Sequence, residues 1–273
     1  MTTNEHPAPA PWTRQKCIDE APEDLGRLGV VVAGDCLSST TTALRWARPV
    51  AEQRGLTLTC VEISSTQAVP SLIRLSASAS LLVVGASPTL PVGRSGHAST
   101  LTHMVTHAGC SVVVVPQDHH TRPDAPIVVG ISDASPPEEY AIGTAFDAAS
   151  RHRVPLVAVH CWNEPGALGL PSVNWSPIEW ADHSERERAV VAEQLAGFQE
   201  RYPDVSVQRI LRNDRTASVL IPLARAAQLV IVSAGDDPTG RTALRDAALP
   251  ALLRHADVPV LVARRPGARS AAR

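Results

Sequence analysis

Short, continuous apolar runs recur along the second half of this 273-residue chain, and they predict β-strands. Most lack the two-residue alternation of a half-exposed strand, which is typical of parallel strands buried on both faces. Helical patterns separate them, so the order of strand and helix predicts a doubly wound α/β domain. The predicted strands lie at residues 127–131, 156–160, 205–211, 229–232 and 258–262, and the predicted helices at 137–151, 177–201, 216–227 and 242–255.

The longest of these helices carries a clear start signal. It opens with Ser176-Pro177-Ile178-Glu179, in which serine and glutamate form a capping box and proline takes the first helical position. The sequence therefore predicts that this helix begins at Pro177.

The first half repeats the same pattern in a shorter form. Gly85 and Ser233 occupy equivalent positions 148 residues apart, whereas Asp35 and Asp133 are only 98 residues apart. The first copy therefore lacks about 50 residues, corresponding to one long helix and the strand after it, at about 162–211 of the second copy. A duplication of this length predicts two tandem domains rather than a solenoid. The first copy keeps predicted strands at residues 29–34, 56–63, 81–85 and 111–115, and helices at 39–54, 69–79 and 99–108.

If the strand order of each sheet is 3-2-1-4-5, the missing strand is an edge strand. Its loss then leaves every internal strand pairing of the first copy intact, so the short copy is able to fold. The predicted organisation is a disordered leader at 1–25, a truncated domain at 26–116, a linker at 117–125, a full domain at 126–264 and a tail at 265–273.

Charge and composition narrow the range of partners. A net charge of -2 gives no electrostatic drive toward nucleic acid or an anionic membrane surface. No apolar run approaches 18 residues, and the start of the chain is polar and rich in proline. We therefore expect a cytoplasmic protein. The five cysteines show no CxxC spacing and several lie in apolar runs, so we expect buried, reduced thiols and no metal site.

Ligands of open α/β sheets bind beyond the carboxyl ends of the strands, where the strand order reverses. In this chain that rule selects the segments that follow the first and fourth strands of each copy. The first copy offers Asp35 and the loop that begins at Gly85, and the second copy offers Asp133 and the loop that begins at Ser233.

These segments resemble the universal stress protein family. The opening of the first copy, an Asp after the first strand followed by Ala43-Leu44-Arg45-Trp46-Ala47, is similar to the start of such a domain. Its close, His107-Ala108 before an apolar strand, recurs as His255-Ala256. The resemblance covers about residues 28–116 and 126–264, and it implies a tandem protein with sheets in the order 3-2-1-4-5.

The resemblance also implies ATP as a ligand, because many family members bind it. The Asp after the first strand, here Asp35 or Asp133, would then contact adenine, although it could equally cap the next helix. A G-x2-G-x9-G-[ST] loop after the fourth strand would hold ribose and phosphates, since glycines let backbone N–H groups approach them.

This chain departs from that loop in both copies. In the first copy the pattern falls on Gly85, Pro88, Ala98 and Ser99, and Pro88 lacks a backbone donor. Arg94 could compensate by binding phosphate directly. In the second copy the pattern falls on Ser233, Asp236, Asp246 and Ala247, and its carboxylates oppose a triphosphate unless a cation bridges them.

Three functional hypotheses follow from the sequence. The first is a non-enzymatic stress-response module with an ATP site that is weak in the first copy and lost in the second. The second is an interaction scaffold that binds no nucleotide, in which the last strands of the two copies pair as an internal pseudo-dimer and two chains form a homodimer. The third, a nucleotide-using enzyme, lacks the S-G-G-x-D-S or H-x-G-H signature that it would need after the first strand.

Overall fold

The computed structural model describes residues 13–15, 28–34, 38–62, 68–86, 100–131, 136–162, 177–234 and 248–265. In chain order they form β1 (Thr13–Gln15), β2 (Leu28–Gly34), α1 (Ser38–Arg54), β3 (Leu58–Glu62), α2 (Ala68–Ser76), β4 (Ala79–Gly85), α3 (Thr100–His107), β5 (Ser111–Val115), β6 (Ile127–Ile131), α4 (Pro136–His152), β7 (Leu156–Trp162), α5 (Pro177–Arg201), β8 (Val207–Asn213), α6 (Thr216–Ala224), β9 (Leu229–Ser233), α7 (Leu249–His255) and β10 (Val260–Ala263).

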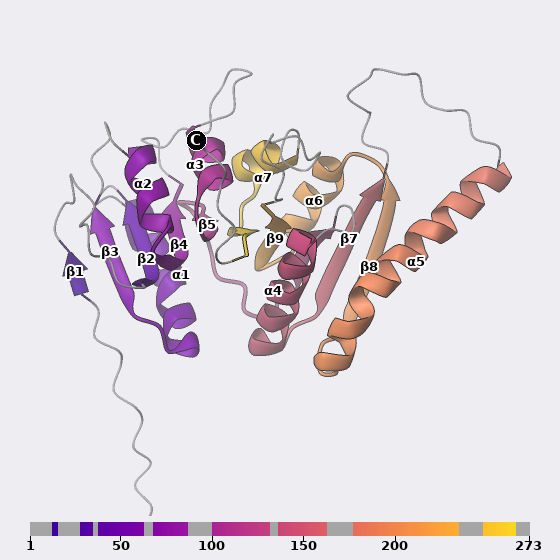
Figure 1. Ribbon diagram of the computed structural model, residues 1–273, viewed down its shortest axis with the longest axis horizontal. Helices are drawn as coiled ribbons and strands as arrows, with labels where there is room; N and C mark the ends of the chain where they lie inside the picture. The colour runs from indigo at the N-terminus through magenta and orange to yellow at the C-terminus, as the bar shows by residue number, and fades with distance from the viewer. Residues whose placement is uncertain are drawn as a thin grey trace, which may run out of the picture.

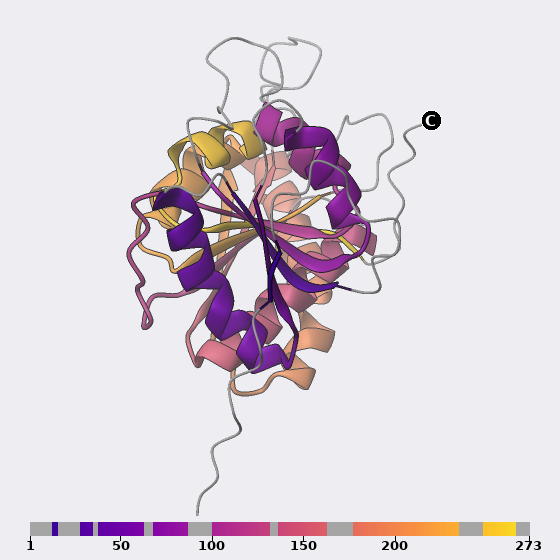
Figure 2. The same ribbon diagram turned by 90° about the vertical axis from the view of Figure 1, so that its left-hand side faces the viewer.

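These strands join into one sheet. Its ten strands lie in the order β1-β3-β2-β4-β5-β10-β9-β6-β7-β8, and neighbours are parallel except for β5 and β10. The second half reads β8-β7-β6-β9-β10, which confirms the expected order 3-2-1-4-5. The sheet crosses the whole molecule in Figure 1, and its strands fan out in the end view of Figure 2 because each strand is twisted against the next.

Seven helices of the described residues cover the two faces of this sheet, and each face has one core that spans both halves. On one face, α1, α4 and α5 bury side chains such as Ala47, Phe146 and Leu195 against the sheet. On the other face, α2, α3, α6 and α7 bury side chains such as Leu75 and Leu252. The five residues of β5, β6 and β9 are all buried, which confirms the prediction of strands enclosed between two helical layers.

The edge of the first half differs from the prediction. Residues 1–25 were expected to form a disordered leader, but Thr13–Gln15 form β1, which pairs in parallel with β3. The position of β1 in the sheet matches that of β8 in the other half. Loss of the third strand would leave the N–H and C=O groups of β3 without partners, and an extended leader segment satisfies them.

The two halves meet where β5 pairs with β10. Val113 faces Leu261, Val112 faces Val262, and Val114 faces Val260. Val113 and Leu261 are 148 residues apart and therefore equivalent in the repeat, so the pairing has a local two-fold axis between them. The pairing expected between the last strands of the two copies is thus observed within the chain. Each of the two strands covers the edge of the other, and both edges would otherwise be exposed.

A thiol in the core of the first half provides a test of this packing. Burial raises the pKa of Cys110 from 9.0 to about 12, whereas Cys60 is only partly buried. The raised pKa contributes stability that is complete below pH 9 and is lost as the pH rises toward about 12. At pH 8, we expect N-ethylmaleimide to label Cys110 at least about 100-fold more slowly than Cys60, because the thiolate reacts. Peptide mass spectrometry after timed labelling measures both rates, and equal rates would contradict the packing.

Candidate functional site

The carboxyl ends of β2 and β4 lie side by side and form the switch point of the first half. Ala33 pairs with Val84 at the end of the ladder between these parallel strands, so Gly34 and Gly85 end adjacent strands. On the other side of β2 lies β3, and the chain crosses back over the sheet before it enters β4. The strand order therefore reverses at these two glycines, as it does at ligand sites of open α/β sheets.

Two of the eight candidate residues lie within the described part of the chain. Gly85 is the buried last residue of β4 and pairs with Val115. Ser233 is the last residue of β9, is 6% exposed, and pairs with Ala263. They stand at equivalent places in the two halves. The remaining candidates lie outside the described residues: Asp35, Pro88, Arg94, Ala98, Ser99 and Asp133.

A buried hydroxyl at the switch point was not foreseen from the sequence. Thr40 lies in the first turn of α1 and is 8% exposed, and its Oγ1 atom has no hydrogen-bond partner among the described residues. It packs closely on Gly34: the Thr40 Oγ1 is the atom nearest to a Cβ added at Gly34, and the Thr40 Cβ would lie 2.9 Å from it. Buried hydroxyls are normally hydrogen-bonded, so this group has unused capacity at the edge where a polar ligand is expected. The first half therefore fits a polar ligand at this edge.

The second half places an acid at the corresponding position. Glu138 follows Thr40 by 98 residues, the same interval that separates Asp35 from Asp133, and each is the third residue of its helix. Glu138 is 3% exposed, and its side chain is not without an interaction partner. An acidic side chain here favours the N-terminus of α4 but opposes a phosphate group.

His160 and Glu187 form a further polar pair near the switch point of the second half. His160 belongs to β7 and is buried, since it is 4% exposed. Its Nδ1 atom lies 3.1 Å from the carbonyl oxygen of Ile131, and its Nε2 atom lies 2.9 Å from Oε2 of Glu187. The pair holds α5 to the end of β6, just before the segment with Asp133.

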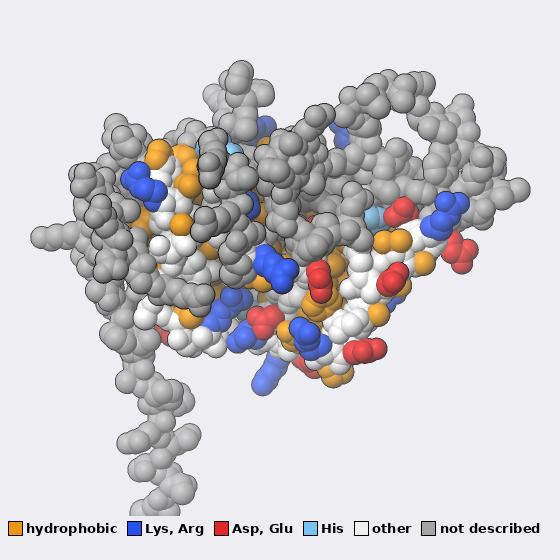
Figure 3. Space-filling model, viewed as in Figure 1, with side chains coloured by type: hydrophobic (Ala, Val, Ile, Leu, Met, Phe, Trp, Pro, Cys, Tyr) orange, Lys and Arg blue, Asp and Glu red, His pale blue; other side chains and the backbone are white. Residues whose placement is uncertain are grey.

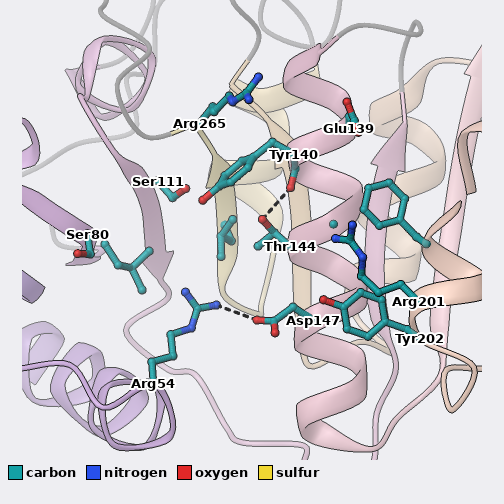
Figure 4. A pocket seen from close by; sticks show the side chains of 14 residues that line it. Arg54, Ser80, Ser111, Glu139, Tyr140, Thr144, Asp147, Arg201, Tyr202 and Arg265 are labelled. Atoms are coloured by element: carbon teal, nitrogen blue, oxygen red, sulfur yellow. Dashed lines mark hydrogen bonds and ion pairs between the residues drawn. The ribbon is translucent and has the colours of Figure 1, made fainter.

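A pocket of about 400 Å³ lies elsewhere, on the face covered by α1 and α4. Figure 4 shows Tyr140 extending from α4 toward Ser111, while Arg54 reaches from α1 to Asp147. On this face, basic and acidic side chains are interspersed over the helices rather than gathered in one patch (Figure 3). Groups of three or more His, Cys, Asp or Glu side chains able to hold a metal ion are absent from the described residues.

Comparison with known proteins identifies the second half directly. The model of the universal stress protein family matches residues 125–264. A universal stress protein of Mycobacterium tuberculosis is 37% identical over 206 residues, which cover 74% of this chain and 68% of that protein. The chain belongs to the universal stress protein family.

Other relatives extend this result. A second universal stress protein of Mycobacterium tuberculosis is 40% identical over 173 residues, 63% of this chain and 54% of that protein, so the match spans about half the length of that relative. The structure of a universal stress protein from Archaeoglobus fulgidus is 12% identical and has a TM-score of 0.52, covering 89% of this chain and 98% of that one. That similarity supports the fold. Within the described part of this universal stress protein, no helix is long and apolar enough to cross a membrane.

Proposed function

We propose that this chain is a non-enzymatic regulatory or protective module of the cytoplasmic stress response, which binds an adenine nucleotide through a degenerate site in its first half. The observation that carries this proposal is the meeting of three features at one edge. Gly34 and Gly85 end adjacent strands, and the Oγ1 of Thr40, which has no partner in the described part of the chain, is buried beside Gly34. Together with family membership, these features support a polar ligand at the carboxyl edge of the first half.

The residues that would hold the nucleotide follow from the strand ends. Asp35 would contact adenine, and the loop after Gly85 would surround the ribose and phosphates. Pro88 and Ala98 depart from the glycines of that loop, so Ser99 and Arg94 would make the remaining phosphate contacts. Bound ATP would stabilise the folded first half through linkage, without a reaction.

The second half should bind nucleotide more weakly or not at all. Its loop begins at Ser233, continues with Asp236 and Asp246, and its switch point carries the buried acid Glu138. Near a triphosphate these acids add like charge, which costs free energy at short range. We therefore propose one weak site for each chain.

The second candidate function is an interaction scaffold that binds no nucleotide. The antiparallel pairing of β5 with β10 favours it, because this fold already joins two sheets through strand edges. At the outer end of the sheet, β8 has one strand neighbour, β7, among the described strands. A homodimer through that edge would extend the sheet.

Calorimetric titration of the full chain with ATP and Mg²⁺ separates the two functions. We expect one site for each chain, with a dissociation constant on the order of 100 μM. Thr40→Val keeps the shape of the side chain and removes the hydroxyl, so affinity should fall about 5–10-fold. Glu138→Gln is the matched control in the other half and should leave the wild-type site unchanged.

Three other results, from this titration and from two further assays, would contradict the proposal. Micromolar binding at two sites would contradict the proposed loss of the second site. A silent titration, with no ATP in the denatured purified protein by mass spectrometry, would favour the scaffold. Release of labelled phosphate above the rate of a heat-denatured control would show that the protein is an enzyme.

A further inference from the structure

The pocket between α1 and α4 is a second, separate candidate for ligand binding. Its volume is about 400 Å³, within the range of small-molecule sites. Leu81 of β4 and Leu261 of β10 form an apolar floor, and Ser80 and Ser111 lie at the amino ends of β4 and β5. It therefore combines residues of both halves and lies beside the strands that join them.

This pocket exists because the two halves are not symmetrical around their junction. In the repeat, Tyr140 corresponds to Thr42, and Arg265 corresponds to Gln117. Thr42 donates a hydrogen bond of 3.1 Å to the carbonyl oxygen of Gln117, so the linker closes its side of the junction. No hydrogen bond joins Tyr140 to Arg265, as far as the structure describes these segments. The corresponding space on that side stays open.

One of the polar groups around this space is an unused hydrogen-bond donor. Within the described part of the chain, the hydroxyl of Tyr140 makes no hydrogen bond, and it points toward Ser111 in Figure 4. The hydroxyl of Ser111 is fixed, because it accepts from the backbone N–H of Arg264 at 3.0 Å and donates to the carbonyl oxygen of Arg264 at 3.2 Å. Tyr140 therefore supplies a hydrogen-bond donor that no described residue uses, whereas the hydroxyl of Ser111 is held by the backbone of Arg264.

The opposite end of the space is basic. Arg54 lies 3.5 Å from one oxygen of Asp147, and Arg151 lies 2.9 Å from the other. Two guanidinium groups share this one carboxylate. The pocket lining holds three arginines, Arg54, Arg201 and Arg265, and two acids, Glu139 and Asp147, so its formal net charge is +1. Both Arg54 and Asp147 are about one-third exposed, which leaves the guanidinium of Arg54 accessible to a ligand.

We propose that this pocket binds a small organic anion. Its charged group would pair with Arg54, its apolar or aromatic body would lie on Leu81 and Leu261, and a hydroxyl or carbonyl group at its far end would accept from Tyr140. A guanidinium recognises carboxylate or phosphate through paired hydrogen bonds, so either group would serve.

The pocket is independent of the proposed nucleotide site. Ser80 and Gly85 lie near opposite ends of β4, which separates the two places by about 16 Å at the rise of a strand. Saturating ATP should therefore not displace a ligand from the pocket.

The test uses 4-hydroxybenzoate, which has a carboxylate at one end and a hydroxyl at the other. Its neutral isostere, 4-hydroxybenzamide, serves as the comparison, and binding is followed by chemical-shift titration of the ¹⁵N-labelled full chain. We expect millimolar or tighter binding of the carboxylate, and at least about tenfold weaker binding of the amide.

Two matched comparisons locate the site, one between two arginine variants and one between two ligands. Arg54→Gln should weaken binding of 4-hydroxybenzoate at least about tenfold, whereas Arg48→Gln, an exposed arginine of the same helix, should not change it. Tyr140→Phe should weaken binding of 4-hydroxybenzoate about 3–10-fold, whereas binding of benzoate, which lacks the hydroxyl that Tyr140 would contact, should not change. Equal affinity for acid and amide, equal effects within either comparison, displacement by ATP, or no shift up to about 10 mM would each overturn the proposal.

Discussion

Leu261→Asp is expected to unfold the protein or to separate its halves under conditions in which the wild type is folded. Leu261 is 4% exposed at the centre of the β5–β10 pairing, opposite Val113. A carboxylate there would be buried beside apolar side chains and have no partner, a cost of about 4–5 kcal/mol or more. Urea unfolding followed by circular dichroism measures the loss.

Val190→Asp provides the control for this variant. Val190 is 39% exposed on α5, so the same charge meets water there and should change stability by less than about 0.5 kcal/mol. If Leu261→Asp lost no more stability than Val190→Asp, the antiparallel junction would be wrong.

Phe146→Ala should destabilise the folded state by about 3–5 kcal/mol. Phe146 is a fully buried residue of α4, and its ring stacks on Phe198 at 5.6 Å and on Tyr202 at 5.8 Å between ring centroids. The substitution removes the centre of this aromatic cluster and leaves a cavity between α4 and α5. Thermal and urea unfolding of the two proteins give the difference in free energy.

Phe146→Leu shows how much of the loss of stability comes from the cavity, because leucine is also apolar but much larger than alanine. Leucine fills most of the space, so its cost should stay below that of alanine and near 1–1.5 kcal/mol, about the value for a conservative core change. Equal losses of stability in the two variants would mean that the space around residue 146 is not tightly packed by the aromatic cluster.

The helices and central strands of this fold could be predicted because each has a local signal. The capping box before Pro177 placed the start of α5 correctly, and continuous apolar runs located the buried strands. Strand β1 could not be predicted in this way. Thr13, Arg14 and Gln15 form no apolar pattern, and their place in the sheet depends on backbone hydrogen bonds with β3.

The candidate site was predictable only as far as strand ends define it. Gly85 and Ser233 lie where the repeat placed them. The unpartnered hydroxyl of Thr40 depends on how tightly α1 packs on Gly34, which no spacing in the sequence encodes. The bond between His160 of β7 and Glu187 of α5 joins residues 27 positions apart, and no local pattern in the sequence signals it.

The strand at the edge of the first half also bears on how such a chain can tolerate a deletion. In the second half the third position of the sheet belongs to β8, which follows β7 in the chain, whereas in the first half it belongs to β1, which precedes β2. Equivalent edge positions of the sheet are thus occupied by a strand that follows its half in one case and precedes it in the other. A shortened duplicate need not regain its lost segment, because another extended segment that reaches the exposed edge can pair with it instead.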